Sequence, residues 1–259
     1  MSGRSRRALV LASALAVVVA FPAAVSASHS WGGYHWARTS NPFTLKLGDS
    51  VSAAWDGYLS TTSSDWSVST VLDTTIVAGR NIARPKQCRP TAGRVEVCNA
   101  AYGSNGWLGV ASIWASGSHI TRGTVRLNDT YFKTATYDTP AWRNLVSCQE
   151  IGHTLGLDHQ DENFGNPNLG TCMDYTNDPS SNQHPNQHDY DQLVTIYSHL
   201  DSTTTVSSAS GTAPGKAGSR VADAAWGTLV AVTNHGHGGM YVRDLGGGNL
   251  IVTHVFWAH

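Results

Sequence analysis

The sequence has few charged residues and no excess of positive charge. Only 14% of its 259 residues are charged, and 17 Lys and Arg stand against 18 Asp and Glu. Binding to nucleic acid needs clustered positive charge, so we expect no nucleic-acid partner. Lysine and glutamate are scarce while Gly, Ser, Thr, Trp and Asn are frequent, a composition that favours a secreted globular protein containing β-strands.

Long hydrophobic runs are also scarce, and the clearest one lies near the N-terminus. Three arginines precede an apolar run at 8–21, and small residues at 25–27 suit cleavage, so we interpret 1–27 as an export signal. A membrane anchor is the alternative, but the run is short for a spanning helix and is followed by Pro22. We therefore expect a secreted, extracellular protein with no stable membrane anchor. The arginine pair at 6–7 leaves both the Sec and the twin-arginine routes open.

The chain without this signal is acidic and has a length that suits one domain or two. Removing 1–27 takes away three arginines and no acidic residue, which leaves 14 Lys and Arg against 18 Asp and Glu. We divide the rest into a main domain at 28–201, a Ser/Thr/Gly-rich linker at 202–222 and a C-terminal β meander at 223–259. No internal repeat is visible in the sequence, and we expect a monomer.

Cysteine is rare as well, with four in the chain. Four cysteines in an exported protein typically form two disulfides, for which three connectivities exist. We favour Cys88 with Cys98, which closes a local loop, and Cys148 with Cys172. Closing the second loop is expected to stabilise the fold by on the order of 3 kcal/mol.

Alternating and helical periodicities together predict an α+β fold. The segment 43–47, FTLKL, alternates as a strand does, and the stretch that opens with Asp49 and Ser50 as candidate caps has helical spacing. A closing helix is predicted at 188–200. Further strands are predicted at 70–77, 94–99, 108–114 and 124–127.

A helix of about 16 residues is predicted to begin near Pro140, which fits a first helical turn. Asp138 or Thr139 can cap its start, and Gly156 suits the left-handed residue that follows a helix. One inward stripe along it is formed by Trp142, Leu145, Val146, Gln149 and His153. A buried amide and a buried imidazole need partners, and a shared metal ion would satisfy both.

The end of this helix has the spacing of a catalytic zinc site, which needs three protein ligands and an open position for water. Gln149 and His153 lie one turn apart on the same face. Gly156 then lets the chain turn so that His159 can swing back toward the metal. Glu150 is placed to take a proton from the water and to pass it to a leaving amine.

The pattern E-x-x-H-x-x-G-x-x-H from Glu150 to His159 resembles the signature of the metzincin zinc proteases, and of their matrixin-like branch in particular. The segment 171–175, TCMDY, resembles the Met-turn that lies beneath the metal in that family, with Met173 as its methionine. The order of predicted elements resembles the family's over about 31–200. The resemblance implies a zincin-like catalytic domain with a mixed twisted sheet, a site helix and a closing helix.

Two positions around this signature need separate comment. Tyr175 stands two residues after Met173, as in astacin- and serralysin-like members, and the resemblance implies a catalytic phenol that can reach the metal or the oxyanion. The alternative is a buried aromatic beneath the site. Gln149 stands where the signature has histidine, and its amide oxygen is a weaker zinc ligand than an imidazole nitrogen. We expect lower zinc affinity at unchanged site charge, because both side chains are neutral.

The sequence therefore predicts a secreted zinc-dependent metalloendopeptidase that acts on a protein or peptide substrate. One catalytic Zn²⁺ would be held by Gln149, His153 and His159, with Glu150 as general base. The alternative is a catalytically silent zincin-fold protein that binds protein or cell-wall material. An acidic group beside the site is interpreted as a polar loop rather than a Ca²⁺ site: Asp158, Asp161 and Glu162.

Overall fold

The computed structural model describes residues 29–207, 226–233 and 238–258. The predicted export signal at 1–27 and the predicted linker from 208 onward lie outside the described residues. Within the described ranges, no helix has the length and apolar character needed to cross a membrane.

The described chain has an α+β structure, which confirms the predicted class. Its helices are α1 (Ala53–Trp66), α2 (Pro140–Thr154) and α3 (Gln187–Ile196), with short 3₁₀ turns η1 (Pro85–Gln87) and η2 (Pro179–Ser181). Its strands are β1 (His35–Trp36), β2 (Phe43–Ser50), β3 (Leu72–Ala78), β4 (Val95–Ala100), β5 (Trp107–Ser116), β6 (His119–Asn128), β7 (Thr228–Thr233), β8 (Gly238–Gly246) and β9 (Asn249–Trp257). The order of strand, helix, strands, site helix and closing helix is the order predicted for the main domain.

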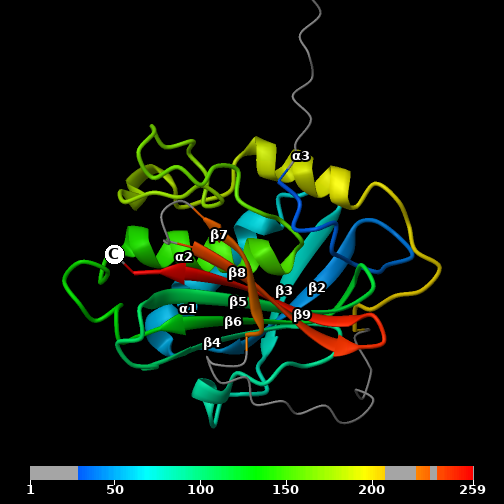
Figure 1. Cartoon of the computed structure of the whole chain (residues 1–259), viewed down its shortest axis with the longest axis horizontal. Helices are drawn as coiled ribbons and strands as arrows, with labels where there is room; N and C mark the ends of the chain where they lie inside the picture. The colour runs from blue at the N-terminus through cyan, green and yellow to red at the C-terminus, as the bar shows by residue number, and fades with distance from the viewer. Residues whose placement is uncertain (1–28, 208–225, 234–237, 259) are drawn as a thin grey trace, which may run out of the picture.

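The described strands form one sheet in the order β3-β2-β4-β6-β5-β9-β8-β7, with β1 paired to β6 beside this path. The strands β3, β2, β4 and β6 are parallel, whereas β5 is antiparallel to β6. The predicted C-terminal meander is confirmed as the antiparallel strands β7, β8 and β9. Strand β9 also pairs with β5, from Trp107↔Trp257 to Ser116↔Asn249, so the meander extends the main sheet (Figure 1).

Helix α2 begins and ends where its capping residues predict. The Thr139 side chain accepts a hydrogen bond from the backbone N–H of Trp142 at 3.3 Å, and Pro140 is the first helical residue. Gly156 follows the helix end with a φ of 97°, and a Cβ there would collide with the carbonyl oxygen of Tyr34. The helix packs against α1 and against β5 and β6, which buries the face that carries the candidate ligands.

Two predicted helix boundaries are wrong. Asp49 and Ser50 do not cap α1, because they end β2 and pair there with the neighbouring strands. Their backbone groups are used in the sheet, so the helix begins after Ser52. Helix α3 ends at Ile196 instead of 200, because the buried Arg38 side chain binds the chain that follows and holds it away from the helical path.

Both predicted disulfides are present in the structure. Cys88 is bonded to Cys98, and Cys148 of α2 is bonded to Cys172 of the segment 171–175. Met173 in that segment is completely buried, and its sulfur would lie 2.6 Å from a Cβ placed on Gly152. A glycine at position 152 therefore lets the methionine pack directly against the backbone of α2.

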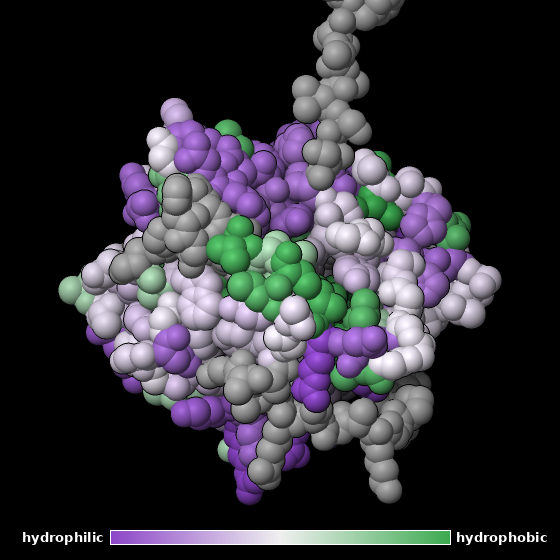
Figure 2. Space-filling view, viewed as in Figure 1, coloured by the Kyte–Doolittle hydropathy of each residue, from purple (hydrophilic) through white to green (hydrophobic). Residues whose placement is uncertain are grey.

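The outer strand of the meander carries exposed apolar side chains. Leu229, Val230 and Val232 of β7 are 44%, 51% and 59% exposed. Figure 2 shows hydrophobic residues gathered at the centre of this face of the molecule, over the meander. The inner strand of the meander, β9, pairs with β5, and its residues Val252, Val255 and Phe256 are buried.

Candidate metal centre

Three buried histidines from different parts of the chain meet beside α2. His153 lies in the last turn of α2, His159 follows the turn at Gly156, and His254 lies on β9. One ligand atom from each lies within 4.8 Å of the other two. We call these residues the three-histidine cluster. The structure brings two predicted ligands together and adds His254, which the sequence reasoning missed.

The ring nitrogens of this cluster are suited to a metal ion. Nδ1 of His153 donates to the carbonyl oxygen of Leu157 at 2.9 Å, which leaves its Nε2 with a free lone pair. That Nε2, both ring nitrogens of His159 and Nδ1 of His254 are buried and make no hydrogen bond to any described residue. Leaving such groups buried without a partner costs about 1–3 kcal/mol each, so a shared cation would offset a real penalty.

Burial also keeps the cluster in the protonation state that a metal requires. Desolvation lowers the pKa of His153 to about 4. Desolvation, together with repulsion from His153, lowers the pKa of both His159 and His254 well below the ordinary value. All three imidazoles are therefore neutral at pH 7, and a neutral imidazole is the form that binds a metal.

Gln149 lies one turn before His153 and is completely buried. Its amide nitrogen donates to the carbonyl oxygen of Cys172 at 2.8 Å. Its Oε1, the atom able to ligate zinc, has no hydrogen-bond partner in the described part of the chain. The assignment of Gln149 as a ligand stays a prediction, and this unpartnered oxygen is compatible with it.

Glu150 is buried beside the cluster. Its Oε2 lies 3.9 Å from Nδ1 of His254, and the absence of a side chain at Gly109 of β5 provides the space that the carboxyl group fills. Burial raises the pKa of Glu150 well above its usual range, and the nearby backbone of Ala111 opposes this only in part. Neither carboxyl oxygen makes a hydrogen bond of ordinary geometry within the described ranges.

Tyr175 is buried against two members of the cluster. Its hydroxyl lies 2.9 Å from Nε2 of His254, and its ring stacks on His159 with 4.1 Å between centroids. When Nε2–H of His254 donates to this hydroxyl, Nδ1 is the lone-pair nitrogen. The structure thus places Tyr175 in contact with His254, where it orients the ring.

The acidic group beside the site is partly used in loop structure. Asp161 accepts hydrogen bonds at 2.5 Å from the backbone N–H of Asn163 and from the side chain of Asn166. Asp158 and Glu162 each have a carboxylate oxygen 3.4 Å from Nδ1 of His159. Burial and the neighbouring carboxylates raise the pKa of Glu162 to about 6.

The cluster is enclosed. His153, His159 and His254 are 0%, 6% and 2% exposed. Trp31 covers one side, with its ring centroid 5.4 Å from that of His153 and its Nε1 donating to the sulfur of Met240 on β8. A peptide can reach these imidazoles only if this cover moves.

Neither a family model nor a curated protein matches the chain. Among solved structures, it is similar to High choriolytic enzyme 1, a hatching enzyme zinc-protease from Oryzias latipes (Medaka fish), with 10% sequence identity and a TM-score of 0.35. The match covers 63% of this chain and 94% of that chain. A likeness this remote assigns no family, so function has to be argued from the geometry of the site.

Proposed function

We propose that the protein is a secreted zinc-dependent metalloendopeptidase. The observation that carries the proposal is the three-histidine cluster, in which each buried imidazole keeps a nitrogen without a hydrogen bond among the described residues and which lies beside the carboxyl group of Glu150. Imidazole nitrogens are preferred zinc ligands, and three of them with one position left open make a catalytic set. The two disulfides suit an extracellular protein.

The ligands in this proposal are His153, His159 and His254. His254 supplies the third imidazole that the signature helix lacks. Gln149 offers its Oε1 as a weaker donor to a five-coordinate ion, which keeps a position for water. Tyr175 fixes the orientation of His254 through the contact at 2.9 Å. A bound zinc ion would polarise the scissile carbonyl and make a water molecule acidic enough to attack at neutral pH.

Glu150 is the general base of the proposed reaction. Burial favours its protonated form in the metal-free protein, whereas a neighbouring divalent cation favours the carboxylate. As a carboxylate it accepts the proton of the attacking water and returns it to the leaving amine. Its oxygen at 3.9 Å from the His254 ring is close enough to the ligands for this role.

Substrate access belongs to the proposal, because the cluster is enclosed. Separation of Trp31 from Met240 would open the side that these residues cover. Trp31 belongs to residues 29–36, which we call the N-terminal segment, and Met240 belongs to the meander. The hydrogen bond between their side chains joins these two parts of the chain. A protein or peptide substrate would then approach from this side.

The test is cleavage of a peptide library by zinc-loaded protein and by Glu150→Gln. The substitution keeps the size of the side chain but removes the base, so turnover should fall by about 10² or more while zinc stays bound. Asp73→Asn, which makes the same exchange of carboxyl for amide at an exposed residue of β3, serves as a control for the chemical change. Equal cleavage by wild type and Glu150→Gln excludes Glu150 as base. Tight zinc binding with no cleavage by the wild type would favour the silent, binding-only alternative.

A further inference from the structure

A second group of metal-ligating side chains lies apart from the three-histidine cluster. His35 of β1, His119 of β6 and Asp201 beyond α3 each offer one ligand atom, and these atoms lie within 4.8 Å of one another. His199 adjoins them, with its Nε2 3.2 Å from Nε2 of His35. We call these four residues the second cluster. Sequence patterns did not identify it, because its members come from separate segments.

The distances within the second cluster match those between ligands of one ion. A zinc ion with bonds of about 2.0–2.1 Å in tetrahedral geometry places its ligand atoms about 3.3 Å apart. Oδ1 of Asp201 lies 3.2 Å from Nε2 of His119, 3.6 Å from Nε2 of His35 and 3.8 Å from Nε2 of His199. The ring of His35 is nearly perpendicular to those of His119 and His199, at 82° and 85°. The donors of His35, His119 and Asp201 thus converge on one point, and His199 lies beside them.

Neighbouring groups orient the donors toward that point. Nδ1 of His35 lies 3.0 Å from the carbonyl oxygen of Gly33, which can only accept, so Nδ1 carries the proton and Nε2 has the lone pair. Buried Arg38 binds Oδ2 of Asp201 through its side chain at 3.0 Å and its backbone N–H at 3.2 Å. Oδ1 is therefore left to face the histidines. Such outer contacts are typical of built metal sites.

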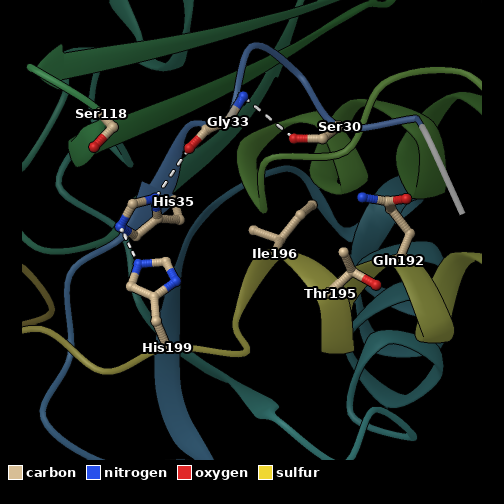
Figure 3. A pocket seen from close by; sticks show the side chains of 8 residues that line it. All are labelled: Ser30, Gly33, His35, Ser118, Gln192, Thr195, Ile196 and His199. Atoms are coloured by element: carbon tan, nitrogen blue, oxygen red, sulfur yellow. Dashed lines mark hydrogen bonds between the residues drawn. The ribbon is translucent and has the colours of Figure 1, made fainter. Parts of the chain in front are cut away.

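An ion has a route to the second cluster. A cavity of about 300 Å³ is lined in part by His35 and His199. Figure 3 shows these two rings directed toward each other at the cavity, with the hydrogen bond from His35 to Gly33 above them. The side chains of His119 and His199 are 38% and 51% exposed, whereas that of Asp201 is 10% exposed. The group is thus open on one side and braced on the other.

We propose that His35, His119 and Asp201 bind a second zinc ion, with His199 beside it. Two imidazoles and one carboxylate suit zinc, and an ion held between separate segments of the chain has a structural role. This site goes beyond the proposed peptidase activity and shares no residue with it.

The second ion would brace the N-terminal segment against the rest of the molecule. His35 belongs to the same short segment as Trp31, whose backbone N–H donates to the carbonyl oxygen of Gly156 at 2.8 Å and whose ring packs on His153. His199 and Asp201 lie beyond α3, far along the chain. A metal that binds only the folded arrangement of these parts stabilises it, and it holds the segment that covers the three-histidine cluster.

The test counts zinc ions bound by the full chain after treatment with a chelator and dialysis against buffered zinc. Wild type should bind two ions per chain, and His119→Ala/His199→Ala should bind one. The double variant changes only the more exposed members of the second cluster, so the ion pair between Arg38 and Asp201 is kept. His184→Ala is the control, because His184 is an exposed histidine 2.7 Å from a carboxylate oxygen of Asp65 and should leave the count at two.

Equal zinc content in wild type and His119→Ala/His199→Ala would overturn the proposal and leave an ordinary hydrogen-bonded histidine–aspartate group. The zinc-free melting temperature of the double variant checks its fold. If it does not fold, His199→Ala alone carries the test and should weaken one of the two zinc sites by about 10-fold or more. His153→Ala/His159→Ala separates the two claims: a count unchanged by that pair refutes the proposed function but not the second site.

Discussion

Single side chains decide what the three-histidine cluster can do. Gln149 has its amide nitrogen committed to the Cys172 carbonyl, so only a weak oxygen donor remains for a metal. In the proposed site His254 provides the third imidazole, and its ring contacts Tyr175. Glu150 lies 3.9 Å from His254, so the strand that would complete the ligand set also borders the proposed general base.

The members of the site differ in how far a sequence pattern can identify them. Glu150, His153 and His159 are close in sequence, and helix geometry with a glycine turn fixes their relation. His254 reaches the cluster only because β9 pairs with β5, where His254 lies opposite Ala111. No local spacing encodes a contact made through strand pairing, so this ligand could not be predicted from the motif.

The meander is an element of the core, and this leads to a prediction about stability. Phe256 of β9 is completely buried and contacts Trp142 of α2 and Tyr175. Phe256→Ala should lower the free energy of unfolding by about 3–5 kcal/mol, because it removes a large side chain and leaves a cavity. Val230→Ala on exposed β7 should change it by less than about 0.5 kcal/mol. Urea unfolding of both variants measures this, and similar effects at the two positions would show that β9 is not part of the core.

Helix boundaries with local signals and the positions of the strands were predicted well, but the pairing of the strands was not. Helix α2 has a cap at Thr139, Pro140 in its first turn and Gly156 after its end, and each signal acts within a few residues. The meander was predicted from alternation, but alternation does not say which strand it joins. The caps predicted at Asp49 and Ser50 failed for the same reason, since pairing in the sheet used those residues instead.

The whole molecule should respond to pH through its buried histidines once zinc is removed. The pKa of His153 is about 4 and those of His159 and His254 are well below 6.5, so the unfolded chain binds more protons than the folded chain below about pH 6.5. Stability from these groups is present at neutral pH and is lost as the pH falls from about 6.5 toward 4. Glu150 acts oppositely, because its raised pKa makes stability fall as the pH rises above 4.5.

Other carboxyl groups with a raised pKa act as Glu150 does, among them Glu162 with its pKa of about 6, so a single variant has to isolate the histidine contribution. Between pH 7 and pH 5, the urea midpoint of chelator-treated wild type should fall more, or rise less, than that of His153→Gln. The same pH dependence in both proteins would contradict the assignment of His153 as buried and neutral.

At the same scale, the two clusters act on one part of the molecule. The N-terminal segment contacts the three-histidine cluster through Trp31 and carries His35 of the second cluster. A structural ion at the second cluster would keep Trp31 in place over the first. Metal binding at the two places is thus expected to stabilise the same arrangement of chain segments.

The most direct test of the central claim, that the three-histidine cluster binds zinc, is a zinc-competition titration of three proteins. The parent is His119→Ala/His199→Ala, in which only one site is measured, and the other two add His254→Ala or Gln149→Ala to it. His254→Ala should bind zinc about 100-fold more weakly or worse and lose zinc-dependent peptide cleavage, because even partners outside the ligand shell are worth 10- to 100-fold. Gln149→Ala should have a smaller effect, since an amide oxygen is the weaker donor. A His254→Ala protein that binds zinc as tightly as its parent, or cleaves peptides faster, would contradict the account.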